Sequence, residues 1–429
     1  MGDIYDIISS VKLGLLLHLY QPLTQESGVF NDIASSCYLP LLKLIKNQKD
    51  FKVTLNVPLS LLQQMEYYGF SLWIDSLKEL VDAGKVEITG SAAYHPLLTK
   101  IPVEYAEKQI ILNEYGLGYY LGRKTGFEGE PSVMIRNLNG FFTPEMAIDE
   151  SVLNILDDLG YKWVVVDESA LAGNNCKNTA VVVKNRSIKV VVRDREVSNI
   201  LSFKRDGNID DIAESIKSSG GKIIALDGEA FGHHNKEGIY LLEALIEAVV
   251  KTGAEFVTIS GLVNQLQVSE VDKIRESSWG AVEKDIEQGN PYPLWNAKDN
   301  RLQNKLWNLM TGFISAYADN NDYGGAEDYE TMPIWKIEEL EKITNLKLKA
   351  ALKRDLYLNQ ALSSDQFWWV SNKEMPDGKV LYDANMLKRS LEMYKKVLSM
   401  GGNEAVAKQL EADINEIMAE VGESDTRIY

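Results

Sequence analysis

The histidines of the chain all follow short apolar runs. His18, His95, His233 and His234 are the only four histidines, and each falls at, or just beyond, the carboxyl end of an expected strand. Because the carboxyl ends of strands build the active site of a parallel barrel, this shared position indicates a functional cluster. For any single histidine, a side chain satisfied by loop contacts stays an alternative.

Acidic side chains occupy the same kind of position. Glu145 follows one apolar run after a Thr-Pro pair, Asp167 closes WVVVD, and Asp227 closes KIIALD. Glu87 lies within KVEITG, where an unpaired charge would be costly. We therefore expect Glu87 either to pair with a cation such as Lys85 or to face a solvated pocket.

A group of carboxyls at one barrel mouth suits glycoside hydrolysis. Two carboxyls whose pKa values are pushed apart can act as an ionised nucleophile or base and a protonated acid. Nearby aromatic rings could stack on sugar faces, although each ring taken singly is more often part of the core. These rings belong to Tyr20, Tyr94, Phe141, Phe142, Phe231, Trp279, Trp368 and Trp369.

A metal site is an alternative use of the histidines, because imidazole suits zinc. Asp167 or Asp227 would complete the ligands. However, the sequence contains no HxxxH or HxxEH spacing, and the adjacent pair His233 and His234 could bind one ion only with strained geometry. We expect no metal and no cofactor, and a metal-dependent deacetylase or mannosidase on a related barrel stays an alternative.

Short apolar runs alternate with longer helical patterns in the first part of the chain, which predicts βα units and a closed or nearly closed barrel. An open doubly wound sheet is disfavoured, because no Gly-rich dinucleotide loop follows the first run. The expected strands are 11–18, 51–57, 85–90, 137–142, 163–167, 222–227 and 255–260, and the clearest helices between them are 60–83, 103–121, 150–159 and 236–251.

Three further regions complete the organisation. Residues 180–192 (AVVVKNRSIKVVV) predict a hairpin, which we interpret as an insertion in a βα loop. Residues 266–300 suit a linker that covers the cleft or straps two parts together. From residue 301 onward, helical periodicity at 302–317, 337–361, 383–399 and 404–421 predicts an antiparallel bundle. The expected domains are a barrel at 1–265, the linker or cover segment at 266–300, and a helical domain at 301–429.

The composition excludes several classes of partner. With 45 basic and 62 acidic residues in 429, the net charge is −17. We therefore expect the protein to bind nucleic acid and anionic membranes poorly. Cys37 and Cys176 cannot form a disulfide framework or a cysteine zinc site. The start is acidic and the run 13–17 is too short to span a bilayer, so we expect a cytoplasmic protein.

Five ordered segments make the chain resemble glycoside hydrolase family 57, which comprises α-amylases, amylopullulanases, 4-α-glucanotransferases and branching enzymes. The segments cover most of the chain and match the family patterns HxHQP, GxxE…HP, GxWxxE, DxExFG and a weaker Asp-aromatic segment. They are 18–22 (HLYQP), 84–96, 140–145 (GFFTPE), 227–233 (DGEAFGH) and 363–368 (SSDQFW). The resemblance implies an α/β fold with an incomplete (β/α)7 barrel, followed by an α-helical domain that contributes to the cleft.

The resemblance also implies retaining chemistry on the α-glucosidic bonds of an α-glucan or malto-oligosaccharide substrate. It implies Glu145 as nucleophile and Asp227 as acid/base. By the same resemblance, the substrate-binding residues are expected to be His18, Tyr20, Gln21, Glu87, His95, Phe142, Glu229, His233, Asp365 and Trp368.

Two positions depart from the family pattern. Tyr20 stands where the family has a second histidine, and Phe142 stands where it has a tryptophan. The phenol can still donate a hydrogen bond but stays neutral, and the phenyl ring keeps a stacking face without an N–H donor. Hydrolysis, transfer by a 4-α-glucanotransferase or branching enzyme, and a non-catalytic carbohydrate-binding protein on this fold all stay open.

Overall fold

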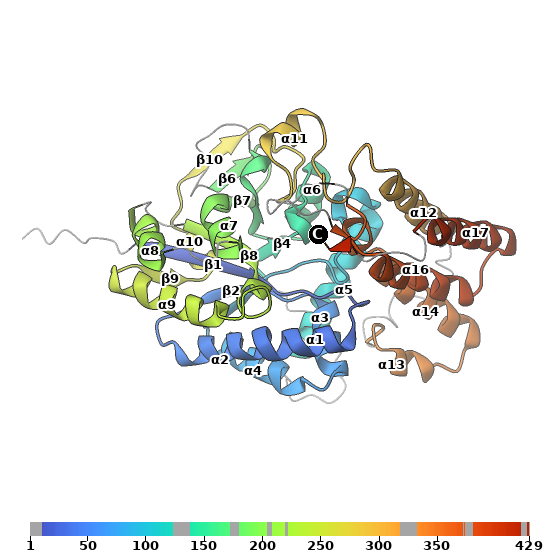
Figure 1. The fold of residues 1–429 in the computed structure, drawn as a ribbon, viewed down its shortest axis with the longest axis horizontal. Coiled ribbons are helices and arrows are strands. Elements are labelled where there is room, and N and C mark those ends of the chain that lie inside the picture. Colours follow the sequence, from blue (N-terminus) through green and yellow to red (C-terminus); the bar gives the residue numbers. More distant parts are fainter. Residues whose placement is uncertain are drawn as a thin grey trace, which may run out of the picture.

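The computed structural model describes residues 11–122, 138–171, 180–203, 208–218, 222–317, 333–371, 373, 381–421 and 427–428. Cys176 lies outside these residues. Two parts are visible in Figure 1: strands surrounded by helices in the first two thirds of the chain, and a group of helices formed by its last third. Among the described helices, none combines the length and apolar composition that a bilayer crossing requires.

Parallel strands form a barrel-like ring in the first part. Within the described residues, seven strands succeed one another around it: β1 (Lys12–His18), β2 (Val53–Asn56), β3 (Val86–Ile88), β4 (Gly140–Phe142), β5 (Trp163–Val166), β7 (Lys189–Val192) and β8 (Lys222–Asp227). β8, β1, β2 and β3 pair in parallel, as do β4, β5 and β7. Because all seven run the same way, their carboxyl ends open on one mouth.

Backbone hydrogen bonds on both sides join these groups of strands into the ring. The amide of Phe142 on β4 donates to the carbonyl of Gly90 beyond β3 over 3.0 Å, and the amide of Asp194 after β7 donates to the carbonyl of Ile223 on β8 over 2.7 Å. Large side chains fill the interior, among them Phe142 and Trp163. A Cβ on Gly140 would lie 1.9 Å from the Trp163 ring, so only glycine fits at that point.

The predicted hairpin is confirmed, but its interpretation as an insertion is wrong. β6 (Ala180–Val183) pairs antiparallel with β7, and Asn185 turns the chain with φ 64°. β7 then pairs in parallel with β5 and takes a place in the ring. The strand expected at 255–260 is the shorter β9 (Glu255–Val257), which pairs with the start of β1, and β10 (Val268–Val271) pairs in parallel with β6.

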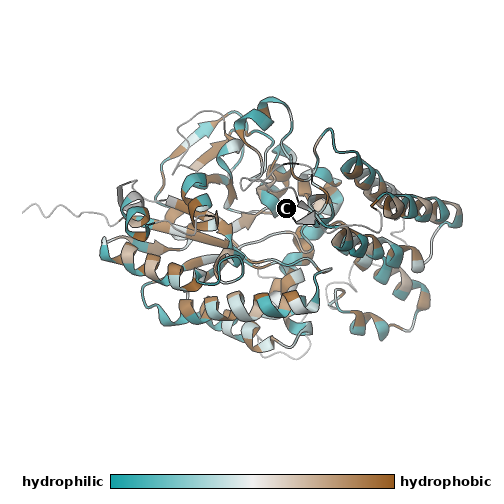
Figure 2. Cartoon of the chain, in the orientation of Figure 1, coloured by the Kyte–Doolittle hydropathy of each residue, from teal (hydrophilic) through white to brown (hydrophobic). Residues whose placement is uncertain are grey.

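Helices surround the strands, and Figure 2 shows hydrophilic and hydrophobic residues mixed along most of them. The predicted helix at 60–83 is two helices. Gly69, just after the end of the first helix, has φ 83°, a conformation that interrupts the helix. The helices of this part are α1 (Ser27–Ile33), the π-helical η1 (Ala34–Tyr38), α2 (Leu39–Asn47), α3 (Leu59–Tyr67), α4 (Ser71–Asp82), η2 (Leu98–Lys100), α5 (Val103–Leu121), η3 (Pro144–Met146), α6 (Glu150–Asp158), η4 (Glu168–Ala170), α7 (Arg195–Phe203), α8 (Ile209–Ser218), η5 (Gly228–Ala230), α9 (Gly238–Lys251), α10 (Ile259–Val263) and α11 (Glu283–Glu287).

The last third forms the predicted helical group beside the ring (Figure 1). It consists of α12 (Arg301–Tyr317), α13 (Ile337–Glu341), α14 (Leu346–Ala361), α15 (Asp365–Trp368), α16 (Ala384–Ser399), α17 (Glu404–Val421) and the short pair β11 (Leu381–Tyr382) and β12 (Arg427–Ile428). Tyr292 and Trp295 of the linker are each 1% exposed and lie in the core shared with these helices. The linker therefore straps the two parts together.

Candidate active site

Glu145 stands on a strained turn at the barrel mouth. It lies in the short helix η3 directly after β4, with φ 60° and ψ 18°, a conformation that costs a non-glycine residue about 1–3 kcal/mol and is typical of functional sites. The indole Nε1–H of Trp279 donates to its Oε2 over 2.8 Å. Nδ1 of His95 lies 3.7 Å from its Oε1. The turn thus presents the carboxyl to a ring of polar partners.

Asp227 is the last residue of β8 and pairs in register with His18 at the end of β1. Burial raises the pKa of Asp227 to about 6, and the nearby Arg193 guanidinium opposes that rise. A carboxyl with this pKa exchanges a proton near neutral pH, which is what acid and base catalysis both require.

The carboxyls beside Asp227 also hold their protons more tightly than usual. Burial and the charge of Asp227 raise the pKa of Glu229 to about 8, and the backbone amide of Tyr20 donates to Glu229 Oε1 over 3.1 Å. The Tyr38 hydroxyl donates to the same oxygen. Gln21 Nε2 lies 3.5 Å from it, so Gln21 supports Glu229 from the HLYQP segment.

The pKa of Glu145 is raised well above its ordinary value. Burial is the largest cause, followed by the charges of Asp365 and Asp227, while the hydrogen bonds from Trp279 and Ser364 oppose the rise. Glu145 and Asp227 therefore lie close enough to interact electrostatically.

Two predicted histidines contact each other at the mouth. Nε2 of His18 and Nε2 of His95 are 3.2 Å apart, while the Nδ1 atoms meet Asn56 Oδ1 at 2.6 Å and Ser364 Oγ at 3.1 Å. Burial lowers the pKa of His18 to about 4 and that of His95 well below its ordinary value. Both imidazoles are thus neutral near pH 7.

The two family departures occupy ring stacks beside these histidines. Phe142 stacks on His18 with centroids 4.6 Å apart, and Tyr20 stacks on His95 at 4.0 Å. The Tyr20 hydroxyl donates to Asp365 Oδ2 over 2.5 Å, so the helical part supplies a carboxyl to the same cluster. Tyr20 therefore keeps a polar contact that its neutral hydroxyl can make.

Glu87 is not brought to this cluster. Its carboxylate accepts hydrogen bonds from Thr54 over 2.9 Å, from the backbone amide of Ser260 over 3.1 Å, and from the Ser260 hydroxyl. Lys85 Nζ instead donates to backbone carbonyls of residues 45, 46 and 48. Of the two alternatives for Glu87, pairing with Lys85 is not found, because hydroxyl and amide donors satisfy the half-buried carboxylate.

Two other predicted residues lie beside the cluster rather than in it. Nδ1 of His233 lies 3.7 Å from Asp32 Oδ2 on α1, and its ring packs near His234. Trp368 is half-buried and packs near Trp369, with ring centroids 4.9 Å apart. A role of either side chain in binding a sugar stays a prediction.

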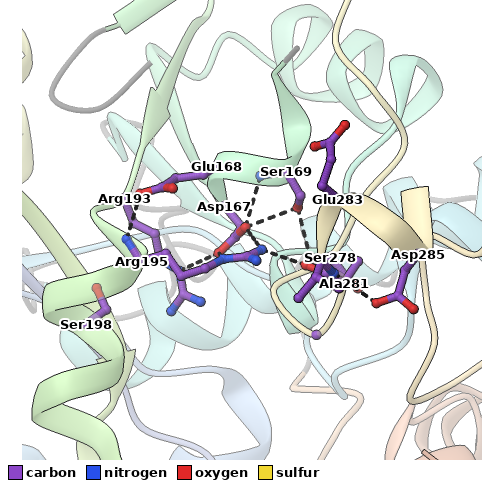
Figure 3. A network of polar contacts seen from close by, with 12 residues as sticks. Asp167, Glu168, Ser169, Arg193, Arg195, Ser198, Ser278, Ala281, Glu283 and Asp285 are labelled. Atoms are coloured by element: carbon purple, nitrogen blue, oxygen red, sulfur yellow. Dashed lines mark hydrogen bonds and ion pairs between the residues drawn. The ribbon is translucent and has the colours of Figure 1, made fainter. Parts of the chain in front are cut away.

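Asp167 has a structural partner set. It is fully buried and accepts hydrogen bonds from Arg193 and Arg195, both of which Figure 3 shows around it. The two guanidinium groups hold the pKa of Asp167 below its ordinary value although burial opposes this. Asp167 is therefore ionised and holds the two arginine side chains in place. Within the described part of the chain, no group of three or more His, Cys, Asp or Glu residues is arranged to hold a metal.

Sequence reasoning missed several polar residues of the site. Asn56 ends β2 beside His18, and Ser364 precedes Asp365 in a segment already singled out. Arg193 directly follows β7, so the rule that polar residues follow buried strands would have found it. Trp279 was noticed as an aromatic residue of the linker, but its hydrogen bond to Glu145 had no sequence signal.

Comparisons with known proteins address the family and the fold of the chain. The profile of "Glycosyl hydrolase family 57" matches residues 16–275. An α-amylase of Pyrococcus abyssi is 28% identical over 153 residues, which cover 35% of this chain and 21% of that protein. A putative α-amylase of Methanocaldococcus jannaschii is 25% identical over 282 residues, covering 60% and 57%. The chain thus spans less than two thirds of these relatives.

A solved structure shows the same fold over almost the whole chain. It is the family 57-type branching enzyme of the archaeon Pyrococcus horikoshii, with a TM-score of 0.63 and 16% sequence identity. The similarity covers 96% of this chain and 95% of that one. The helical part therefore belongs to the shared fold along with the barrel.

Proposed function

Because this chain belongs to glycosyl hydrolase family 57, we propose that it cleaves α-glucosidic bonds in α-glucans with retention of configuration. Glu145 is the nucleophile and Asp227 is the acid/base. The observation that carries this assignment is the pair of buried, mutually interacting carboxyls at the ends of β4 and β8. The catalytic groups come from the barrel, residues 1–265, and Asp365 reaches them from the helical domain.

The proposed reaction has two steps. Protonated Asp227 gives its proton to the glycosidic oxygen while ionised Glu145 attacks the anomeric carbon, so that the C–O bond to the leaving sugar breaks and a glycosyl-enzyme ester forms. Asp227, now ionised, takes a proton from water, whose oxygen attacks the anomeric carbon and releases Glu145. The pair must carry a single proton at the start.

This requirement gives a bell-shaped pH dependence. Since the singly protonated pair is the active form, activity falls when a second proton is gained at low pH and when the only proton is lost at high pH. The pKa of Asp227 is about 6 and that of Glu145 is raised. The proposal therefore places the active range at higher pH than for two ordinary exposed carboxyls.

The surroundings of the pair suit a neutral sugar. The imidazoles of His18 and His95 are neutral and can exchange hydrogen bonds with hydroxyl groups. The Trp279 indole orients Glu145, and Glu229 and Asp365 offer further oxygens. A hydroxyl group of a second glucan in place of water would give transfer instead of hydrolysis on the same intermediate.

Azide rescue separates the two catalytic roles. We expect Glu145→Ala and Asp227→Ala to lose about 10²–10⁴-fold or more of the activity on maltoheptaose. With 4-nitrophenyl α-maltoside and sodium azide, Glu145→Ala should form the β-glycosyl azide, because azide attacks from the vacated face. Asp227→Ala should form the α-azide through the glycosyl-enzyme. Wild-type rates, or azides of the opposite configuration, would refute the assignment.

A further inference from the structure

Arg193 is a buried cation that contacts both β8, which ends in Asp227, and Trp279, which is hydrogen-bonded to Glu145. Its side chain is 5% exposed, and its Nη1 donates over 2.9 Å to the carbonyl of Ala225, two residues before Asp227 on β8. Its guanidinium carbon lies 5.6 Å from the ring centroid of Trp279. That same indole donates its N–H to Glu145. One side chain thus contacts both arms of the site.

The orientation of Arg193 is fixed from behind by Asp167. Arg193 Nε donates to Asp167 Oδ2 over 2.8 Å, and the amide and hydroxyl of Ser169 donate to Oδ1 over 3.0 Å and 3.1 Å. Arg195 Nε donates to Oδ2 over 3.0 Å. Because charge-assisted hydrogen bonds in a buried setting are strong and directional, the guanidinium plane has little freedom to turn.

The residues around Trp279 are held by the same network and by one lysine. Arg195 Nη2 donates to the carbonyl of Ala281 over 2.6 Å, and Ser169 Oγ lies 3.3 Å from that of Ser278. Figure 3 shows these contacts reaching the linker from Asp167. Lys373 Nζ donates to the carbonyl of Gly280 over 3.1 Å. The backbone on both sides of Trp279 is therefore fastened.

We propose that Arg193 is a positioning residue that holds Trp279 against Glu145 and sets the charge environment of Asp227, so that both carboxyls are tuned by one buried cation. This inference rests on the proposed function. Cation–π contact with the ring keeps the indole N–H aimed at Glu145. The positive charge favours the ionised forms of the carboxyls nearby.

The charged groups facing the carboxyl pair have opposite effects. The cation Arg193 lowers the pKa of Asp227. The carboxyls of Glu145 and Glu229 also interact electrostatically with Asp227. Asp365 faces Glu145 from the helical part. Among these groups, loss of the cation leaves only carboxyls, so we expect both apparent pKa values of the pair to rise and the bell to move to higher pH.

Arg193→Gln and Arg193→Lys test this role through the pH profile of kcat/KM on maltoheptaose. We expect Arg193→Gln to shift both limbs upward by about 1 pH unit and to lower kcat by about tenfold or more with little change in KM. Arg193→Lys keeps the charge and should restore the wild-type limbs, while kcat stays low because the fork to Ala225 and Asp167 is lost.

Arg195→Gln is the matched control. Arg195 binds the same Asp167 as Arg193 does, but Arg193 is the cation that acts on Asp227. Its limbs should stay at the wild-type pH. Folding of every variant is checked by circular dichroism and thermal melting. Unshifted limbs in a folded Arg193→Gln, or an equal shift in Arg195→Gln, would overturn the inference.

A readout that needs no turnover separates this inference from the proposed function. In protein labelled with ¹⁵N-tryptophan, the indole signal of Trp279, assigned through Trp279→Phe, reports the hydrogen bond to Glu145. We expect this signal to titrate with pH in the wild type and to titrate at higher pH in Arg193→Gln. An identical titration in both would overturn the inference even if α-glucans are cleaved, and an inactive wild type would refute only the proposed function.

Discussion

At the scale of single residues, burial sets the protonation of the carboxyls around Asp227. Glu229 is 4% exposed, and its pKa of about 8 compares with an ordinary value of 4.5. In the folded protein it keeps a proton that the unfolded chain releases above about pH 4.5. The stability that this group contributes is therefore complete below its unfolded pKa and is lost as pH rises toward 8.

Glu229→Gln removes that loss, because an amide stays neutral at every pH. We expect the thermal midpoint of the variant to gain on the wild type between about pH 5 and about pH 8, by roughly 3 °C or more. The exposed Glu237→Gln on the following turn is the control and should show a constant difference. A constant difference for Glu229→Gln as well would contradict the raised pKa.

The site residues differ in how far the sequence predicts them. His18, His95, Asp227 and Glu145 were expected from their places after strands, and the structure brings them together. Arg193 also follows a buried strand, but the sequence does not predict it as a site residue, because that strand belongs to the hairpin interpreted as an insertion. The partners of a side chain, such as Trp279 for Glu145, depend on long-range packing that no local pattern records.

At the scale of elements, β7 decides how the ring is completed. Residues 190–192 are fully buried valines, the pattern of a strand covered on both faces. Most β10 residues are exposed. Amide hydrogen exchange should therefore be at least about a hundredfold slower in β7 than in β10, because core strands open only with global unfolding. Similar rates in both would contradict the place of β7 in the ring.

Element types were predicted better than their partners. The helix at 103–121 has the expected bounds, and the strands at 12–18 and 222–227 differ by at most one residue. The pairing of a strand depends on contacts far away in sequence, which is why β9 and β7 were exchanged in the predicted ring. The interruption of the helix at Gly69 was not predicted either, because apolar residues recur at helical spacing on both sides of it.

At the scale of the whole molecule, buried amides join the barrel to the helical domain. Gln109 on α5 is fully buried. Its Oε1 accepts from the amide of Tyr94 over 3.0 Å, and its Nε2 donates to the carbonyl of Asn359 over 3.0 Å. In the same loop, the amide of Ser364 donates to the carbonyl of His95 over 2.9 Å. These contacts bring Asp365 to the mouth of the barrel.

Gln109→Ala should therefore loosen the whole assembly. The truncation leaves a buried amide and a buried carbonyl without partners, which costs about 1–3 kcal/mol for each group. Urea unfolding should show a loss of stability of that order, together with lower activity. Glu107→Ala, an exposed position on the same helix, should stay within about 0.5 kcal/mol. Equal losses in both variants would contradict a coupling through Gln109.

The configuration of the first product tests the central claim most directly. Proton NMR of maltoheptaose cleaved by the wild-type protein records the anomeric signals before mutarotation, with Glu145→Gln as the blank. Retention through a Glu145 ester predicts that the new reducing ends made by hydrolysis appear first as the α-anomer, and that any new glycosidic bond made by transfer to a sugar is also α. First appearance of the β-anomer, or α-anomer formation by Glu145→Gln at the wild-type rate, would contradict it.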